Sequence, residues 1–215
     1  LTLSRLLFIQ NGLVTLGTNN LTIGHNAFIF NPFNTNYVNT SSTGELRKRF
    51  DLTTPTAFNF TVGNGGYSPN QVCFLSWTLA PGSYLASRTV NAKHPQNNCI
   101  SDYLNRYWTV LPSGISNFST NNRFNYQNSD VVGTEASIYG AELTGISWTT
   151  FTPVNAAGDF FIANNISQFG DFTGGGLNCI NDFDTKINAK LFLQGAYITA
   201  SNSMRTDMLT EGIIP

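Results

Sequence analysis

The most evident shortage in this sequence is charge. Charged residues make up 11% of the 215 residues, and eleven Lys and Arg stand against twelve Asp and Glu, whereas about 25% is usual in a soluble domain. Nucleic-acid binding needs clustered cations for the phosphates, so this near-neutral balance excludes it as a main function. No apolar run approaches the roughly 18–20 residues of a membrane-spanning helix, so we expect no membrane span.

Residues that usually carry catalysis or metal binding are also few. The two histidines, His25 and His94, lie far apart, and the sequence holds no C-x-x-C pair, no zinc spacing, no G-x-S-x-G elbow and no P-loop. A glycosidase pair of carboxylates has no sequence signature, but most of the twelve acids lie in turns or beside basic residues. We therefore predict a protein that is not an enzyme, with no catalytic, cofactor-binding or metal-binding residues and no cofactor.

Cysteine is scarce and odd in number: Cys73, Cys99 and Cys179. A Cys73–Cys99 bridge would close a short loop and add about 3 kcal/mol in the loop-entropy model. The alternative, which we favour, is three buried free thiols.

The residues that are abundant favour β-structure. Asn and Thr together form roughly a quarter of the chain, and Thr suits strands while Asn and Gly suit turns. Apolar and polar residues alternate with period two over much of the sequence, for example at 58–62, 118–126 and 186–193, and helical periodicity is almost absent. The fold class predicted is all-β.

Three regions follow from the turn signals. Residues 1–45 are short apolar pieces between Asn/Gly corners, which suit either hairpins or the stacked rungs of a β-solenoid. Residues 46–173 hold seven or eight strand candidates, separated by signals such as Pro81-Gly82 and Pro112-Ser113-Gly114, and are predicted to form an antiparallel β-sandwich. The glycines at 174–176 are interpreted as a linker, and 177–215 as the incomplete start of a further β module.

Three local features have a functional and a structural interpretation. Asn181-Asp182-Phe183-Asp184 is similar to a fragment of a calcium loop, but a solvated turn is favoured. Arg47-Lys48-Arg49 is too short for a basic patch, and we predict a strand with outward cations. The three tryptophans could stack on sugars, but each lies in an apolar strand, so core positions are predicted for Trp77, Trp108 and Trp148.

The order of several motifs resembles that of large repetitive surface proteins of Bacteroidota. Residues 13–24 are similar to their "L-x-L-G-x-x-N-L-x-I-G" pieces, and 58–69 to their "F-x-F-P-V-G…Y-x-P" turn, with Val62 after Thr61 where Pro is frequent. Further similar segments are the strands at 37–38 and 44–50, Asn105-Arg106-Tyr107-Trp108, which is similar to their "N-R-x-W" strand, and the stretch 190–197.

The resemblance implies export by the type IX secretion system, display at the outer-membrane surface, and a role in adhesion, with gliding motility among the processes served. It implies no catalytic residues. The partners expected are neighbouring modules of the same chain or other surface proteins, the secretion machinery during export, and surface glycans. The chain begins with Leu1, and we expect a mature or excised piece of a longer protein. The alternatives are a carbohydrate-binding accessory module of a secreted polysaccharide hydrolase and a glycosidase fragment.

Overall fold

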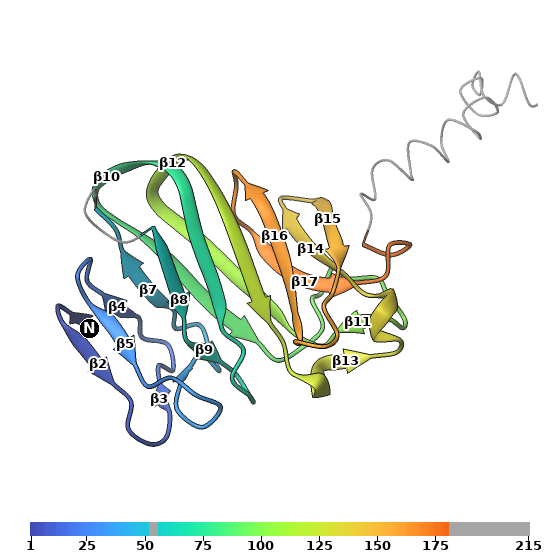
Figure 1. Cartoon of the computed structure of the whole chain (residues 1–215), viewed down its shortest axis with the longest axis horizontal. Coiled ribbons are helices and arrows are strands. Elements are labelled where there is room, and N and C mark those ends of the chain that lie inside the picture. The colour runs from blue at the N-terminus through green and yellow to red at the C-terminus, as the bar shows by residue number, and fades with distance from the viewer. Residues whose placement is uncertain (52–55, 181–215) are drawn as a thin grey trace, which may run out of the picture.

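The computed structural model describes residues 1–51 and 56–180, and it confirms the all-β class (Figure 1). The N-terminal strands are β1 (Thr2–Leu3), β2 (Leu6–Phe8), β3 (Val14–Thr15), β4 (Leu21–Ile23), β5 (Phe28–Phe30), β6 (Val38–Asn39), β7 (Leu46–Arg49), β8 (Ala57–Phe60) and β9 (Val62–Gly63). The later elements are β10 (Asn70–Val90), β11 (Tyr103–Leu104), β12 (Tyr107–Asn125), the 3₁₀ turn η1 (Asn128–Asp130), β13 (Val131–Val132), the 3₁₀ turn η2 (Glu135–Ser137), β14 (Tyr139–Thr144), β15 (Ser147–Pro153), β16 (Phe160–Ile166) and β17 (Asp171–Gly175).

The N-terminal strands stack in parallel, one turn of chain above the next. We call β1, β2 and β3 rung 1, and β4, β5 and β6 rung 2; β7 and β9 belong to rung 3. The registers are Thr2↔Thr22↔Arg47 on one face, Leu6↔Phe28 on the second and Val14↔Val38↔Val62 on the third. Hairpins would pair antiparallel, so this parallel pairing is that of stacked rungs.

Lys48 corrects the prediction of outward cations on this segment. Alternation along β7 places Leu46 and Lys48 on the same, inward side, and both are buried. The Lys48 ammonium donates hydrogen bonds of 2.7 Å to the carbonyl oxygens of Gly24, His25 and Ala27. Burial lowers the pKa of Lys48 to about 8, against the opposing effect of Asp51. A buried cation is tolerated here because three backbone acceptors replace its water.

The sandwich is made by two long strands that fold over. β10 and β12 pair antiparallel from Asn70↔Phe124 to Val90↔Tyr107, with the register interrupted between Leu79 and Tyr84. Before the interruption β10 pairs with β8, and beyond it with β7. β12 changes partner in the same way, from β17 to β16. Pro81-Gly82 and Pro112-Ser113-Gly114 are thus bends within strands, not the separators predicted, and they fold one sheet into two layers (Figure 1).

Aromatic side chains fill the space between the two layers. Trp108 is fully buried, with its ring 5.4 Å from Phe124 and 5.9 Å from Phe161, centroid to centroid. Its indole N–H donates to the Ser68 carbonyl at 2.8 Å. Trp148 is buried, and Trp77 packs half-buried against the same core as Phe74. The core positions predicted for Trp108 and Trp148 are confirmed, and Trp77 lies at the margin of the core.

One hydrophobic core runs from the rungs into the sandwich. The cluster that contains Ile9, Leu21 and Val38 also contains Trp108 and Phe172. β7 joins the two parts directly, because it pairs with β4 on one side and β10 on the other. The sandwich therefore covers one end of the stack of rungs.

The triple glycine is not a linker. Gly174 and Gly175 lie within β17 and are buried, and a Cβ on Gly174 would lie 2.8 Å from Ile138 Cγ2 and 2.9 Å from Leu104. Glycine is needed here because the Ile138 and Leu104 side chains pack directly against the backbone of β17 and leave no room for a Cβ.

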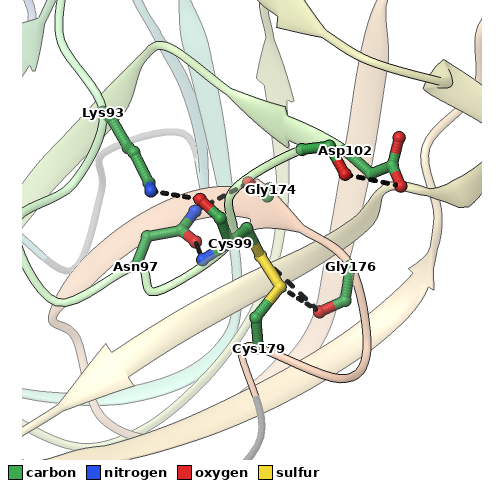
Figure 2. Close-up of a disulfide and its surroundings, with 8 residues drawn as sticks. Lys93, Asn97, Cys99, Asp102, Gly174, Gly176 and Cys179 are labelled. Carbon is green, nitrogen blue, oxygen red and sulfur yellow. Dashed lines mark hydrogen bonds between the residues drawn. A yellow bond between two sulfur atoms is a disulfide. The ribbon is translucent and has the colours of Figure 1, made fainter.

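A disulfide joins Cys99 to Cys179 over a separation of 80 residues, while Cys73 is a free, half-buried thiol. Both cysteine predictions, the Cys73–Cys99 bridge and three free thiols, are therefore wrong. Figure 2 shows the bridge beside Asn97, whose side-chain amide donates to the Gly174 carbonyl. The predictions for 181–215, which include the calcium-like fragment Asn181–Asp184, the alternating segment at 186–193 and most of the further module at 177–215, lie outside the described residues.

Candidate functional site

The most prominent exposed feature is an apolar face on the two-stranded sheet β2–β5. We call it the β2–β5 face and define it as Leu6, Phe8, Phe28 and Phe30. These side chains are 47%, 50%, 54% and 53% exposed. Large apolar side chains scattered singly on a surface are ordinary, but four on adjacent positions indicate an interaction surface.

The geometry of the face follows from strand alternation. In each three-residue strand the central side chain, Leu7 or Ile29, turns inward and packs against the core. The flanking residues turn outward, and the register places Leu6 beside Phe28 and Phe8 beside Phe30. The Phe8 and Phe30 rings are stacked, with centroids 5.6 Å apart. No charged residue lies within either strand.

The sequence carries a signal for this face in two all-apolar triplets. The triplets Leu6-Leu7-Phe8 and Phe28-Ile29-Phe30 are apolar throughout. A strand of three residues can bury only one or two of them on one side, so an all-apolar triplet must expose the others unless both its faces are covered. The sequence alone does not tell which of these two conditions holds.

A small cavity borders the same sheet. It has a volume of about 220 Å³ and is lined by His25, Asn26, Ala27, Phe28, Lys48, Ala57 and Phe58. It lies between β5 and β8, because β8 pairs with β10 rather than stacking on β5. The Lys48 ammonium lies 5.1 Å from the centroid of the Phe58 ring. The cavity therefore borders the β2–β5 face at Phe28 and has one buried cation, Lys48, in its lining.

The two histidines flagged in the sequence are not brought together. His25 is exposed, 3.5 Å from Asp51. His94 is buried and lies 3.1 Å from Asp171, beside a cavity of about 460 Å³. Its Nδ1 accepts a hydrogen bond from the backbone N–H of Gln96, so Nε2 carries the proton and donates to Asp171.

Both ring nitrogens of His94 are therefore occupied within the protein. A general base needs a nitrogen directed at substrate or nucleophile, and here neither is available without breaking an internal bond. Burial alone would raise the pKa of Asp171, but its interactions with His94, Thr109 and the charge of Arg88 together outweigh burial and leave that pKa below its usual value. The pair fastens the loop before β11 to β17.

The buried ion pair of Arg106 and Asp130 also has its partners within the protein. Arg106, in the segment similar to "N-R-x-W", forms a two-point ion pair with Asp130, with Nη2–Oδ1 at 2.9 Å, and donates to the Asn64 carbonyl. It joins the turn after β9 to η1.

Burial and the charge of Glu135 raise the pKa of Asp159, but neither Glu135 nor Asp159 lines the two cavities described above.

Glu142 is buried on β14, and burial raises its pKa to about 8. Its Oε1 has no hydrogen-bond partner among the described residues. No group of three or more His, Cys, Asp or Glu that could hold a metal ion occurs in residues 1–51 and 56–180. No helix in these same ranges is long and apolar enough to cross a membrane.

Comparison of the chain with protein-family models, with curated proteins and with solved structures gives no significant match. The fold and the β2–β5 face therefore define the class of protein from physical features alone: an all-β module in which stacked parallel rungs continue into a sandwich.

Proposed function

We propose that this chain is a structural and adhesive module of a large bacterial cell-surface protein, exported by the type IX secretion system and serving attachment or gliding. The observation that supports it best is the β2–β5 face, a neutral apolar surface on a rigid stack of rungs. Adhesion by apolar contact requires apolar side chains that stay exposed on a scaffold that carries load. Continuous backbone ladders and a shared core supply that scaffold.

The proposal assigns binding to Phe8 and Phe30 and assigns no chemistry to the buried polar groups. His94, Arg106 and Lys48 each satisfy their hydrogen bonds within the protein. The β2–β5 face offers side-chain area without polar groups, which suits contact with another apolar surface by burial of area, at about 25 cal/mol per Å².

The test is a double variant, Phe8→Ser with Phe30→Ser, measured for binding to methyl-terminated monolayers on a quartz-crystal balance. Binding should fall at least tenfold while the melting temperature changes little, because both rings are half exposed. Ile146→Ser, at a 71%-exposed apolar residue in the β14–β15 turn, is the matched control and should bind like the unaltered chain. Equal binding by the double variant would refute the adhesive role of the face.

Export is tested separately in the producing cell. Protease treatment of intact cells should remove the domain, and loss of the type IX machinery should leave it inside. Retention on the surface without that machinery would contradict this part of the proposal.

A carbohydrate-binding accessory module is the second candidate, and one observation favours it. Phe8, Phe28 and Phe30 lie on one flat sheet face, as a sugar-stacking platform requires. Phenylalanine offers no hydrogen bond to a sugar hydroxyl, which favours the first proposal. A glycan array separates the two, because glycan binding that the Phe8/Phe30 double variant loses would establish the second.

A further inference from the structure

The stack of rungs has one covered end and one uncovered end. Rung 3 is covered, since β7 pairs with β10. Rung 1 lies at the opposite end: β1 and β3 are terminal strands of their sheets, and β2 pairs with β5. Within the part of the chain that the structure describes, no strand pairs with the outer side of β1, β2 or β3. In Figure 1 this end lies at the lower left, on the side away from β16.

The backbone of rung 1 presents a row of outward groups. In a parallel ladder, alternate residues bond to opposite neighbours. On β3 the N–H of Val14 donates to the Tyr37 carbonyl and that of Leu16 to the Asn39 carbonyl. Thr15, between them, therefore directs its N–H and C=O away from rung 2. By the same alternation the N–H and C=O groups of Thr2, Leu6 and Phe8 point away from rung 2, because the Leu3 carbonyl and the Ile9 N–H bond to rung 2.

Nothing in the composition of this edge discourages pairing. Natural edge strands are blunted by charge, proline or bulges. Residues 1–24 contain one charged residue, Arg5, and no proline. The inward side chains Leu3 and Val14 are only partly buried, whereas their partners in rung 2, Ile23 and Val38, are fully buried. Leu7 and its partner Ile29 are both partly buried. Another layer on rung 1 would complete the burial of these side chains.

We propose that this end binds one further solenoid rung, supplied by an adjoining module of the surface assembly and running parallel to rung 1. The proposal rests on the proposed function and names the contact by which modules join. The interface between rungs 1 and 2 shows what fits: three short neutral strands with inward Leu, Ile or Val and Gly or Asn corners. The added rung would pair its three strands with β1, β2 and β3, in register with Leu3, Leu6 and Val14.

A second copy of this chain fits less well. Two identical ends meet about a two-fold axis, so each element meets its partner in the opposite direction. The contacts between rungs 1 and 2 are parallel on all three faces. An antiparallel meeting would not continue those columns.

The experiment adds a rung to the whole chain. A copy of residues 1–20 is fused before Leu1, since Thr2 and Thr22 are partners at this spacing. Hydrogen exchange at the amides of Thr2, Leu6, Phe8 and Thr15 should slow at least tenfold, and the melting temperature should rise. A fusion with the same composition in scrambled order is the control. Unchanged exchange in the ordered fusion would overturn the proposal.

Two proline variants keep the result specific. In the extended protein Thr15→Pro should abolish the added protection, because it removes an outward N–H and leaves the backbone bonds to rung 2. It also removes the exposed side-chain bond from Asn39 Nδ2 to Thr15 Oγ1. Val14→Pro removes the N–H that donates to Tyr37 and should lower stability with or without the added rung. If Thr15→Pro retains full protection, the added rung does not pair at this edge and the proposal fails.

Sedimentation of the unaltered chain tests whether a second copy of the chain binds to rung 1. A monomer supports the proposal, and a dimer whose rung-1 amides are protected would overturn it. The monolayer assay on the Phe8/Phe30 variant is independent of these results, so failure of the edge and failure of the adhesive function are distinguishable.

Discussion

Three buried ionisable side chains in this protein have their hydrogen-bonding groups paired with backbone groups or with a carboxylate. Lys48 has three carbonyl acceptors, Arg106 has Asp130, and His94 has Asp171 and a backbone N–H. Glu142 differs, because one of its oxygens lacks a partner among the described residues. The cost of burying each group depends on this difference.

Trp108 is the residue whose truncation should cost most. It fills the centre of the sandwich and donates a hydrogen bond to Ser68. Trp108→Ala should lower the free energy of unfolding by about 3–5 kcal/mol, as removal of large core aromatics does. Trp108→Phe keeps an aromatic ring and should cost less. Urea denaturation checks both, and a loss below about 1 kcal/mol for the alanine variant would place Trp108 outside the core.

Glu142 should make stability fall as pH rises. Burial raises its pKa from 4.5 to about 8, so the folded state holds the proton more tightly than the unfolded state does. Its contribution is fully present below about pH 4.5 and is lost progressively as pH rises from there to about 8, by roughly 5 kcal/mol in total. Glu142→Gln should remove this loss, so it should be the more stable form near pH 9 in urea melts.

Glu45→Gln, at a carboxylate paired with Arg47 near the surface, is the control and should keep the decline between about pH 5 and 8. The same pH slope in Glu142→Gln and in the unaltered chain would contradict the assignment.

At the scale of elements, the sandwich depends on how two strands turn a corner and how β17 is held. β10 and β12 each contribute to both layers, so the bend near Gly82 and Gly114 sets how the layers face each other. β17 lies between β12 and β14, and the disulfide follows its end.

Gly114 should tolerate a side chain less well than Gly82. Both have positive φ, +68° and +76°, which costs any L-residue about 1 kcal/mol. A Cβ on Gly114 would lie 3.3 Å from the Cβ atoms of Ala80 and Ser83, whereas one on Gly82 would meet nothing within 4 Å. Gly114→Ala should therefore cost about 1 kcal/mol more than Gly82→Ala in denaturant melts. Equal costs would show that the bend relaxes freely.

Loss of the disulfide should destabilise the sandwich. The bridge spans 80 residues, and the loop-entropy model gives about 4 kcal/mol for a loop of that length. Cys179→Ser should lower the midpoint of thermal unfolding and make it insensitive to reductant. Cys73→Ser, which removes a free thiol, should change it little. Similar midpoints for the two variants would exclude a stabilising Cys99–Cys179 bridge.

At the scale of the whole molecule, low charge and the apolar β2–β5 face determine how the protein contacts another surface. With a net charge of -1 and 11% charged residues, long-range steering is weak. Binding through the β2–β5 face should change less than twofold between about 50 and 500 mM salt, because screening acts on charges and not on apolar burial. A loss of binding over this range on the quartz-crystal balance would show that charged groups carry the contact.

Local pattern in the sequence was enough for the all-β class, for the Asn/Gly corners of the first rungs and for the core positions of Trp108 and Trp148. Each of these depends on alternation or turn chemistry among neighbouring residues, which a sequence displays directly. The apolar triplets of β2 and β5 were also visible, but not whether their second face would be covered.

Contacts between distant segments were decided only by the tertiary structure. Pro81-Gly82 signals a turn, yet whether the chain ends a strand or bends within it depends on pairing with β12. The partner of Cys99 depends on where β17 lies, since bridges follow spatial and not sequential proximity. Lys48 lies inward because three carbonyl oxygens of the turn between β4 and β5 accept its hydrogen bonds there. These outcomes depend on packing between segments far apart in the chain, which local periodicity does not encode.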